Sequence, residues 1–549
     1  MFKPRPYQIE CIDSVMAGFE FFNKQLVAAP TGSGKTIIAS GLAKKFTEKG
    51  RKVLFLAHRE ELLAQTIEKF GKSSGIFPQL EKAEHKASML ADCVVGSVQS
   101  LTNQKRLDRW PNDHFDLIIV DECHHLMANS YRRILAHFDS KAKVCGITAT
   151  PDRGDKKNLG QYFENIAFEI SLFDLINDGF LSPISVKSIP LQIDLTTVRQ
   201  TAGDYNESDL GNALIPYMRK IASTIASEAS NRKVLMFLPL IATSEAFTKV
   251  FQEHGLNARH VDGASPDRKE IIQWFESQDA GVLCNAMLLV EGFDCPSITD
   301  IVNLRITRSR SLYSQIIGRG TRLLPGCAEF ETKEDRLTAR DFSGKDRLVV
   351  WDFIWLHEKH SLIRPAHLVA QTEEVAEQMT KSAEKASGGD GQRELDLQEL
   401  ESECRRQREQ KLQEELALKA KRKARTVDAI EFALSIHDTT LAEYSPVMKW
   451  EFQQPSEGQM DILMRNGIYP GSVKNKGHAT KIIDLIITRR KLNLSTPKQI
   501  RLMKQLGHPK PETLTLEKAT AYIGQKLGNL GHQNTRRKHE NPNQKQIHV

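Results

Sequence analysis

Short apolar runs alternate with amphipathic stretches from Gln25 to about Ala370. Each run has the length of a strand, and a polar loop and a segment with helical spacing follow it. This rhythm is typical of parallel sheets covered by helices, and the runs fall into two sets, so we expect two α/β domains. The first set of strands is Gln25–Ala28, Val53–Ala57, Cys93–Gly96, Leu117–Val120 and Val144–Thr148. The second set is Val234–Phe237, Ala258–Val261, Gly281–Asn285, Ile301–Leu304 and Leu348–Phe353.

The rhythm lapses near Phe168–Pro190, where Pro183 and Pro190 punctuate the chain, and it ends near residue 370. Beyond that point the chain is rich in Glu, Gln, Lys and Ala, which favours an exposed charged helix or a partly disordered tether. Helical spacing returns after residue 444. We therefore predict a first domain at 1–180, a second at 181–370, a charged helical linker at 371–443, a basic all-helical accessory domain at 444–527 and a disordered basic tail at 528–549.

Positive charge is concentrated at the C-terminal end of the 549 residues. Residues 1–400 hold 49 Lys and Arg against 53 Asp and Glu, whereas residues 401–549 hold 27 against 16. The final segment, 471–549, has 16 basic and 4 acidic residues. This end is expected to bind a polyanion, with Lys474, Lys476, Arg489 and Arg490 as candidate nucleic-acid contacts, and a solvated face or a protein-docking module is the alternative.

Several classes of protein are disfavoured by composition. No stretch approaches the roughly 20 apolar residues of a membrane span, and Met1–Tyr7 lacks the pattern of a secretory leader. We expect a cytoplasmic protein, bacterial or from a phage host, with its eight cysteines as thiols. No C-x-x-C pair is present, so no structural zinc site is expected.

A phosphate-binding loop is predicted at Ala28–Thr36, between a strand and a helix. Its glycines let backbone N–H groups surround phosphate oxygens, and the helix that follows presents its positive end. Lys35 is expected to reach the β and γ phosphates and Thr36 to bind Mg²⁺. Ala29 replaces the first glycine of the usual template. The nucleotide-binding residues of this loop are Thr31, Gly32, Ser33, Gly34, Lys35 and Thr36.

An acidic pair, Asp121 and Glu122, follows the apolar run Leu117–Val120. The pair should therefore lie at the carboxyl end of a buried strand, where open α/β sheets bind ligands. We assign Asp121 as the metal ligand and Glu122 as the general base toward the γ-phosphate. His124 is assigned a coupling role, because no third ligand at suitable spacing supports a zinc site.

The ordered series of motifs resembles the superfamily 2 nucleic-acid helicases and translocases. Its segments are Arg5-Pro6-Tyr7-Gln8, the phosphate loop, Ala57–Leu62, Gly96–Leu101, Asp121–His124, Thr148–Pro151, His260–Gly263, Glu291–Asp294 and Gln315–Arg322. The motif sequences D-E-C-H, T-A-T-P and Q-x-x-G-R-x-x-R are similar to those of the DNA-directed group around type III restriction motor subunits, RadD, UvsW and XPB. Val290 and Glu291 depart from the family pattern, in which threonine or a small residue is common, and no cysteine-rich zinc segment of the RadD kind is present.

The resemblance implies two tandem RecA-like domains that close on one ATP, and it implies roles for further residues. Arg5 and Gln8 would contact the adenine, and Gly292 and Asp294 would touch the nucleotide. Arg319 and Arg322, with Gln315, would serve as finger residues toward the γ-phosphoryl group. His124, Thr148 and Thr150 would couple hydrolysis to movement. His58, Arg59 and Gln99 would contact nucleic acid.

We therefore predict an ATP hydrolase that uses ATP and Mg²⁺ and moves on or remodels DNA that is single-stranded, duplex or branched. RNA remains a possible partner, no membrane partner is expected, and protein partners are not indicated. The alternatives are an RNA helicase, a duplex translocase that leaves strands paired, the motor of a restriction-type nuclease, and a nucleotide-gated clamp that does not travel.

Overall fold

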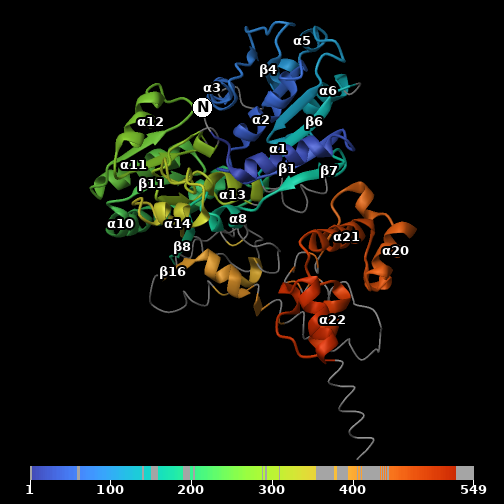
Figure 1. The fold of residues 1–549 in the computed structure, drawn as a ribbon. Coiled ribbons are helices and arrows are strands. Elements are labelled where there is room, and N and C mark those ends of the chain that lie inside the picture. The colour runs from blue at the N-terminus through green and yellow to red at the C-terminus, as the bar shows by residue number, and fades with distance from the viewer. Residues whose placement is uncertain are drawn as a thin grey trace, which may run out of the picture. The chain divides into compact units, whose positions relative to one another are not determined.

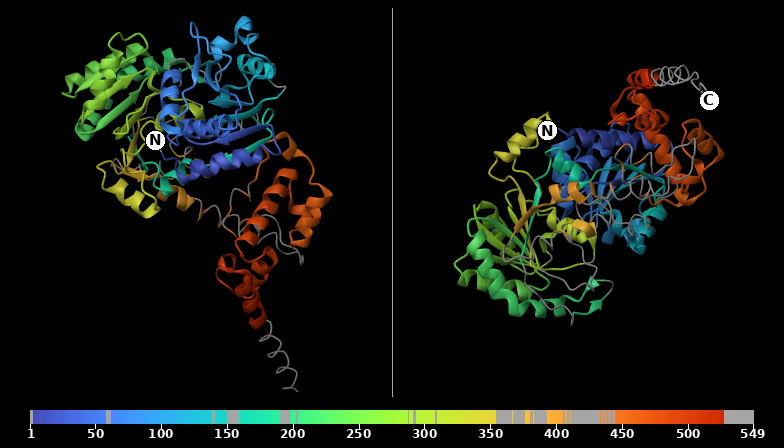
Figure 2. Two further views of the ribbon diagram at one scale, coloured as in Figure 1. Left: turned by 45° about the horizontal axis from the view of Figure 1, so that its top comes forward. Right: turned by 90° about the horizontal axis from the view of Figure 1, so that it is seen from below.

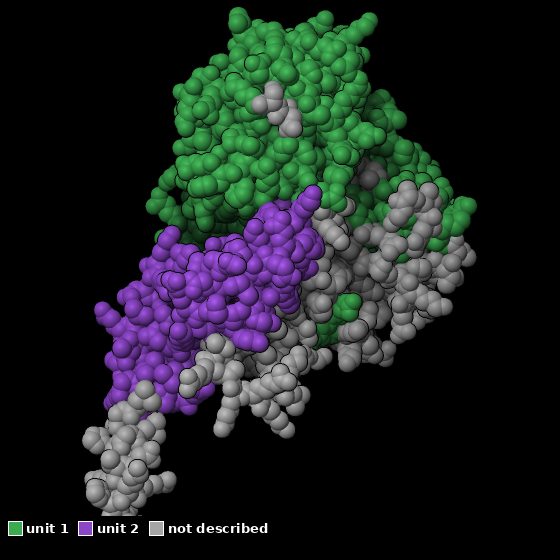
Figure 3. Space-filling view, turned by 90° about the vertical axis from the view of Figure 1, so that its right-hand side faces the viewer, with its two compact units in different colours: residues 1–404 green, residues 405–549 purple. Residues whose placement is uncertain are grey.

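The computed structural model describes residues 3–57, 62–138, 141–149, 159–189, 198–201, 204–286, 288–290, 293–307, 309–353, 393–404 and 444–526, together with isolated positions between 366 and 441. The chain divides into two compact units, residues 1–404 and 405–549, which Figure 3 colours separately. The first unit contains two seven-stranded sheets. The predicted fold class, two tandem RecA-like parallel-sheet domains and a helical C-terminal region, is confirmed in the described residues.

The first sheet has the strand order β3-β4-β2-β5-β6-β1-β7, with all pairs parallel (Figure 1). Its strands are β1 Lys24–Ala28, β2 Val53–Ala57, β3 Gln79–Glu81, β4 Cys93–Ser97, β5 Leu117–Asp121, β6 Lys143–Thr148 and β7 Asn165–Glu169. The central strands are buried on both faces, which explains why they read as continuous apolar runs.

Helices of the first domain connect these parallel strands. They are α1 Pro6–Gly18, α2 Lys35–Thr47, α3 Leu62–Ser74, α4 Val98–Leu101, α5 Gln104–Leu107, the 3₁₀ turn η1 Cys123–His125, α6 Asn129–His137 and α8 Leu172–Asn177. Cys11 of α1, Ile38 of α2 and Phe70 of α3 share one hydrophobic core with Val27 and Phe55 of the sheet. These three helices therefore cover one face of the first sheet, and Figure 2 shows them from two further sides.

The second sheet repeats this plan in the order β12-β13-β11-β14-β15-β8-β16. Its strands are β8 Ile184–Ser188, β11 Lys233–Phe237, β12 Ala258–Val261, β13 Gly281–Asn285, β14 Asp300–Asn303, β15 Leu348–Asp352 and β16 Arg393–Asp396. Five neighbouring pairs are parallel, and only β16 runs antiparallel. Along β11, Val234 and Met236 enter one core while Leu235 and Phe237 enter another. Alternation along the strand thus places a hydrophobic core on each face of the sheet.

The remaining elements of the second domain are helices, turns and a short hairpin. They are β9 Gln200–Thr201, β10 Asp204–Tyr205, α9 Glu207–Leu214, η2 Ile215–Tyr217, α10 Met218–Ala229, α11 Ile241–Glu253, α12 Arg268–Ser277, η3 Leu288–Val290, α13 Arg310–Ile317 and α14 Lys333–Asp341.

All ten strands expected from the apolar runs are present, and their bounds shift by a residue or so. The structure adds strands that the sequence did not indicate. β7 is half-exposed along its length and therefore has no apolar run, and β3 is only three residues long. β16 lies within the segment that we expected to be a linker, and it pairs with β8 through backbone groups that leave no hydrophobic signature. Most of 371–443 and the whole tail 528–549 lie outside the described residues.

The described part of the second unit, mainly residues 444–526, is helical. Its elements are η4 Lys449–Phe452, α20 Glu457–Arg465, η5 Pro470–Ser472, α21 Lys476–Lys491, α22 Pro497–Gln505 and η6 Pro511–Thr513, followed by helical residues 516–526. Leu463, Ala479, Ile482 and Ile500 pack in its core. Among the described helices none is long and apolar enough to cross a membrane. All eight cysteines are buried free thiols.

Candidate ATP site at the seam of two domains

The phosphate loop begins where β1 ends and leads directly into α2. Gly32 and Gly34 have φ values of +89° and +77°, a region that favours glycine, and Gly34 caps the N-terminus of α2. Lys35 and Thr36 are the first two residues of that helix. The local sequence thus directs backbone N–H groups and the positive end of α2 toward one point, which suits phosphate.

The N-terminal motif, Arg5–Gln8, forms hydrogen bonds with this loop. Tyr7 donates its hydroxyl to the Ser33 carbonyl at 2.7 Å, and the Gln8 side-chain amide donates to the same oxygen at 2.8 Å. Gln8 in turn accepts from the Arg5 backbone N–H at 2.9 Å. Both Tyr7 and Gln8 are buried. In this arrangement the Gln8 amide holds the loop, and the predicted adenine contact of Gln8 stays a prediction.

An ion pair joins the loop to the acidic motif: Lys35 Nζ lies 2.8 Å from Glu122 Oε1, and both side chains are largely buried. Glu122 itself has a φ of +45°, which is uncommon for a residue other than glycine. Burial raises the pKa of the Glu122 carboxyl, but the Lys35 ammonium and the His124 imidazole together hold that pKa well below its usual value. Glu122 is therefore an anion whose basicity Lys35 restrains.

Asp121 ends β5, and its Oδ1 accepts the Glu122 backbone N–H at 3.0 Å. His124 Nδ1 lies 3.3 Å from Glu122 Oε2 and 3.4 Å from the Thr148 hydroxyl at the end of β6. One imidazole thus connects the acidic motif with the neighbouring strand end. Thr148 is buried, so a shift of either strand end changes both contacts at once.

The two arginines predicted to be finger residues, Arg319 and Arg322, have partners at Phe293 and Asp294. Arg319 follows α13, is buried, and donates to the Phe293 carbonyl at 2.7 Å. Arg322 forms an ion pair with Asp294, and burial lowers the pKa of its guanidinium to about 10. Gln315 is also buried. Both guanidinium groups are therefore held in fixed positions by neighbours within the second domain.

The seam between the two domains passes directly through these groups. A Cβ atom added at Gly318 would lie 2.4 Å from Thr31 Cβ, so the phosphate loop and the arginine motif touch, and glycine is required at Gly318. Lys69 of α3 approaches Asp294 to 3.9 Å. The arginine motif of one domain thus lies against the phosphate loop of the other.

Several buried polar atoms at this seam have no hydrogen-bond partner within the described residues. They are the hydroxyls of Thr31 and Ser33 and the side-chain nitrogen of Gln315. Buried polar groups normally find partners, so these atoms fit a ligand with many oxygens. Thr36 and Asp121 offer the hydroxyl and carboxylate oxygens that Mg²⁺ prefers. Among the described residues no three His, Cys, Asp or Glu side chains form a metal cluster of their own.

Comparisons with known proteins agree with this geometry. Residues 1–153 match the family model of the res subunit of type III restriction enzymes, and residues 216–323 match that of the helicase conserved C-terminal domain. An ATP-dependent helicase named IRC3, from Saccharomyces cerevisiae, is 34% identical over 346 residues, which are 58% of this chain and 49% of that protein. Residues 1–153 and 216–323 are therefore similar to superfamily 2 helicases of the type III restriction-like group.

Two further similarities were found. A protein named as a mitochondrial ATP-dependent helicase, irc3 of Schizosaccharomyces pombe, is 33% identical over 338 residues, covering 59% of this chain and 56% of that protein. The chain thus spans about half the length of these curated relatives. The ATP-dependent type ISP restriction-modification enzyme LlaBIII, solved bound to DNA, shares the fold with a TM-score of 0.51 and 15% identity, covering 91% of this chain and 43% of that one.

Two lysines near the candidate site were not indicated by the sequence. Burial and the guanidinium groups of Arg322 and Arg319 lower the pKa of Lys69. Lys345 is buried, and its ammonium donates to the Arg322 carbonyl at 2.6 Å and to the Pro296 carbonyl at 2.5 Å. Burial lowers the pKa of Lys345 to about 7. Neither lysine lies in a recognisable motif, so only the fold reveals them.

Phe180 lies in the segment that connects the two domains and contacts side chains of both. Its ring meets that of Tyr7 edge-on at 5.0 Å between centroids, and the Arg5 guanidinium lies 5.5 Å from its centroid. Arg336 of α14 lies over the same ring at 4.1 Å. Arg336 is buried and also donates to the Asp178 carbonyl at 2.9 Å. The N-terminal motif and the second domain thus meet at one aromatic ring.

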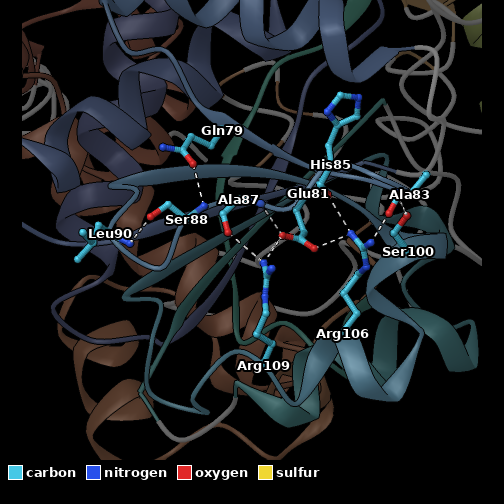
Figure 4. Close-up of polar contacts among 10 residues, drawn as sticks. All are labelled: Gln79, Glu81, Ala83, His85, Ala87, Ser88, Leu90, Ser100, Arg106 and Arg109. Carbon is cyan, nitrogen blue, oxygen red and sulfur yellow. Dashed lines mark hydrogen bonds and ion pairs between the residues drawn. The ribbon is translucent and has the colours of Figure 1, made fainter.

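Gln99, a predicted nucleic-acid contact, lies in α4 after β4, where it accepts from the Ser97 hydroxyl at 2.9 Å. Beside this segment, the fully buried Glu81 binds Arg106 at 2.7 Å and Arg109 at 2.5 Å (Figure 4). The two guanidinium groups also bind the carbonyls of the loop after β3, and the Ala83 N–H of that loop donates to the Ser100 hydroxyl at 2.9 Å. The Glu81 cluster therefore fixes the loop against the Gln99 segment.

The four basic residues predicted to contact nucleic acid in the second unit all make hydrogen bonds inside that unit. Lys474 donates to the Tyr444 carbonyl, Lys476 to Gln453 and Arg490 to Asn466. Arg489 donates to the carbonyls of Ser495 and Glu512 and is only half-exposed. Arg489 thus has a structural role, which the sequence did not indicate.

Four predicted site residues, His58, Arg59, Thr150 and Gly292, lie outside the described residues.

Proposed function

We propose that this protein is an ATP- and Mg²⁺-dependent motor that moves on or remodels DNA. The observation that carries the proposal is the contact between the phosphate loop and the arginine motif, in which Gly318 lies against Thr31 and Arg322 approaches Gly32. Hydrolysis in such a site needs groups from two domains, so it occurs only while they are closed. Opening after phosphate release provides the movement, because closure and opening change how each domain holds the strand.

Each residue has a distinct role in the proposed reaction. Lys35 and the N–H groups of the loop bind the β and γ phosphates, and bound Mg²⁺, held by Thr36 and Asp121, would supply charge stabilisation. When the nucleotide binds, the Lys35 ammonium leaves its ion pair with Glu122 and pairs with the phosphates instead. Glu122 then loses the cation that lowers its pKa and becomes a stronger base toward the attacking water. Arg319 and Arg322 stabilise the charge on the transferring group.

Coupling to the strand is assigned to His124 and Thr148. His124 contacts both Glu122 and Thr148, so a change of charge at Glu122 alters the end of β6. Thr150 follows two positions later in the sequence, and its coupling role stays a prediction. Arg5 and Gln8 would hold the adenine side of the nucleotide, and Gly292 and Asp294 would contact it from the second domain.

DNA is favoured over RNA as the substrate. The first domain matches the motor subunit of type III restriction enzymes, and a restriction-modification enzyme of the same fold was solved on DNA. A restriction-type motor subunit is the second candidate function, favoured by that same family match. We also propose a cytoplasmic location. The fission-yeast relative is named as mitochondrial, so fractionation of the native cell tests this point.

The decisive experiment is ATP hydrolysis by the full chain with single-stranded, duplex and branched DNA and with RNA in parallel. Glu122→Gln should lower DNA-stimulated turnover by about 10³-fold, since it removes the base. The matched control is Glu48→Gln, which alters an exposed carboxylate at the end of α2. Undiminished turnover in the Glu122 variant would remove the site assignment. Stimulation of ATP hydrolysis by RNA and not by DNA would show that RNA is the substrate.

A further inference from the structure

Residues 456–486 and 496–526 repeat the same local structure at a spacing of 40 positions. Ser456 and Gln459 form a capping box at the start of α20, and Thr496 and Gln499 form one at the start of α22. The first helix of each segment ends at a glycine of positive φ, +81° at Gly467 and +82° at Gly507. A 3₁₀ turn and a second helix follow in both.

The internal contacts of the two segments match as well. Gln459 donates its amide to the Thr480 hydroxyl at 2.8 Å, and Gln499 donates to the Thr520 hydroxyl at 3.0 Å. Leu463 and Met503 occupy equivalent core positions, and both are fully buried. Ala479 and Ala519 are likewise fully buried where the second helix of each segment packs. The two segments therefore share their helix caps, the position of the glycine after the first helix, and their core positions, as expected of two copies of one module.

The two copies differ in the charge of their exposed positions. Residues 456–486 contain four Lys and Arg and three Asp and Glu, whereas residues 496–526 contain six and two. In α20, Asp461 forms an ion pair with Arg465 at 2.5 Å. The equivalent positions in α22 are Arg501 and Gln505. Arg465, the one basic residue of α20, is thus paired with an acid on its own helix. The helix α22 contains three basic residues and no acidic one.

We propose that residues 456–526 are a tandem duplication, and that the second copy, through α22, is the surface that binds the phosphate backbone of DNA. The first copy has the same local structure but a lower net positive charge. The proposal rests on the DNA motor proposed above and names its accessory DNA site. Arg501 and Lys504 are the main contacts, and exposed Lys518 on the following helix adds to the field.

The duplication supplies substitutions that the fold already tolerates. Arg501→Asp gives the second copy the residue of the first at the equivalent position, and it lowers the net charge by two. The double variant Arg465→Gln and Lys481→Ala gives the first copy the residues of the second, Gln505 and Ala521, and it also lowers the net charge by two. The two full-length variants therefore match in net charge, and they differ in which copy is altered.

Binding of a fluorescent DNA duplex to the full chain should be measured by anisotropy over a range of salt. We expect Arg501→Asp to raise the Kd about 10-fold and to lower the slope of log Kd against log salt by about 1, as for one lost phosphate contact. The matched double variant should stay within about two-fold of the wild type. Lys504→Met, at an exposed position where the first copy carries Met464, should weaken binding about 3-fold, and it carries the test if Arg501→Asp does not fold.

Equal weakening by the matched double variant would show that only net charge matters, and it would overturn the proposal. Unchanged binding by both Arg501→Asp and Lys504→Met would also overturn it. The motor is tested separately by wild-type ATP hydrolysis with and without DNA. DNA-stimulated hydrolysis in the wild type together with unchanged binding in the variants would contradict the accessory site and support the motor. Weaker binding in the variants without stimulation in the wild type would support the accessory site and contradict the motor.

Discussion

The two sheets of the first unit have the same strand plan and opposite chemistry. Position by position, β4-β2-β5-β6-β1 of the first sheet corresponds to β13-β11-β14-β15-β8 of the second. In the first domain the carboxyl ends of β1 and β5 lead into the phosphate loop and the acidic pair. In the second domain the predicted finger residues are the arginines that follow α13. In the proposed mechanism, one fold thus supplies the nucleotide-binding residues in the first domain and the finger residues in the second.

This difference shows that the sheets fix where loops meet, while a few residues at strand and helix ends decide the chemistry. The charged groups of both domains are balanced before any nucleotide is considered: Lys35 by Glu122, and Arg322 by Asp294. Each of these two ion pairs therefore lies within one domain. Three changes test this comparison of the domains, from the strongest expected effect to the weakest.

Removing the second domain's contribution should have the strongest effect. Arg322→Ala is expected to lower ATP turnover by about 10³-fold, because a finger of this type stabilises charge only in the transition state. Nucleotide affinity, measured with a fluorescent ATP analogue, should change by only a few-fold. Arg219→Ala, which breaks an exposed ion pair with Glu253 in the same domain, is the control. A similar loss in both variants would argue against a finger role.

Removing the buried anion of the first domain should have the next largest effect. Glu81→Gln leaves Arg106 and Arg109 without their charged partner, and breaking such a buried pair costs about 3 kcal/mol. We expect that loss in the free energy of unfolding from chemical denaturation. Glu68→Gln, in an exposed pair with Lys72, should leave that free energy unchanged. Unaltered stability of the Glu81 variant would show that the loop is held by other contacts.

Loosening the support of Arg322 should have the smallest effect. Lys345→Met removes the ammonium that binds the Arg322 and Pro296 carbonyls, and we expect turnover to fall about 10-fold at unchanged KM for ATP. Asp300, Cys295 and Arg322 face this ammonium, and burial lowers its pKa to about 7. Lys345 is therefore charged below pH 7 and neutral above it, so wild-type turnover should decline as pH rises through 7.

The Met variant should lack this step in its pH profile, and Lys345→Arg, which stays charged, should retain turnover above pH 7. A step that persists in the Met variant would assign the titration to another group.

Much of the fold was predictable from the apolar runs, because strands buried on both faces leave a continuous signal. β7 and β16 gave no such signal, since one is half-exposed and the other pairs at an edge. The phosphate loop and the acidic pair were predictable because their chemistry depends on neighbours in the sequence. Lys69, Lys345 and the bracing role of Tyr7 were not, because their partners are remote along the chain.

Phe180 has a consequence for how the cleft can open. Tyr7, Arg5 and Arg336 all rest on this one ring, which belongs to the segment joining the domains. Tyr7 also holds the carbonyl of Ser33 in the phosphate loop. Rotation of one domain away from the other would therefore change the packing on the Phe180 ring. Through Tyr7 the same rotation would also displace the Ser33 carbonyl of the phosphate loop, so domain opening and the shape of the loop are coupled.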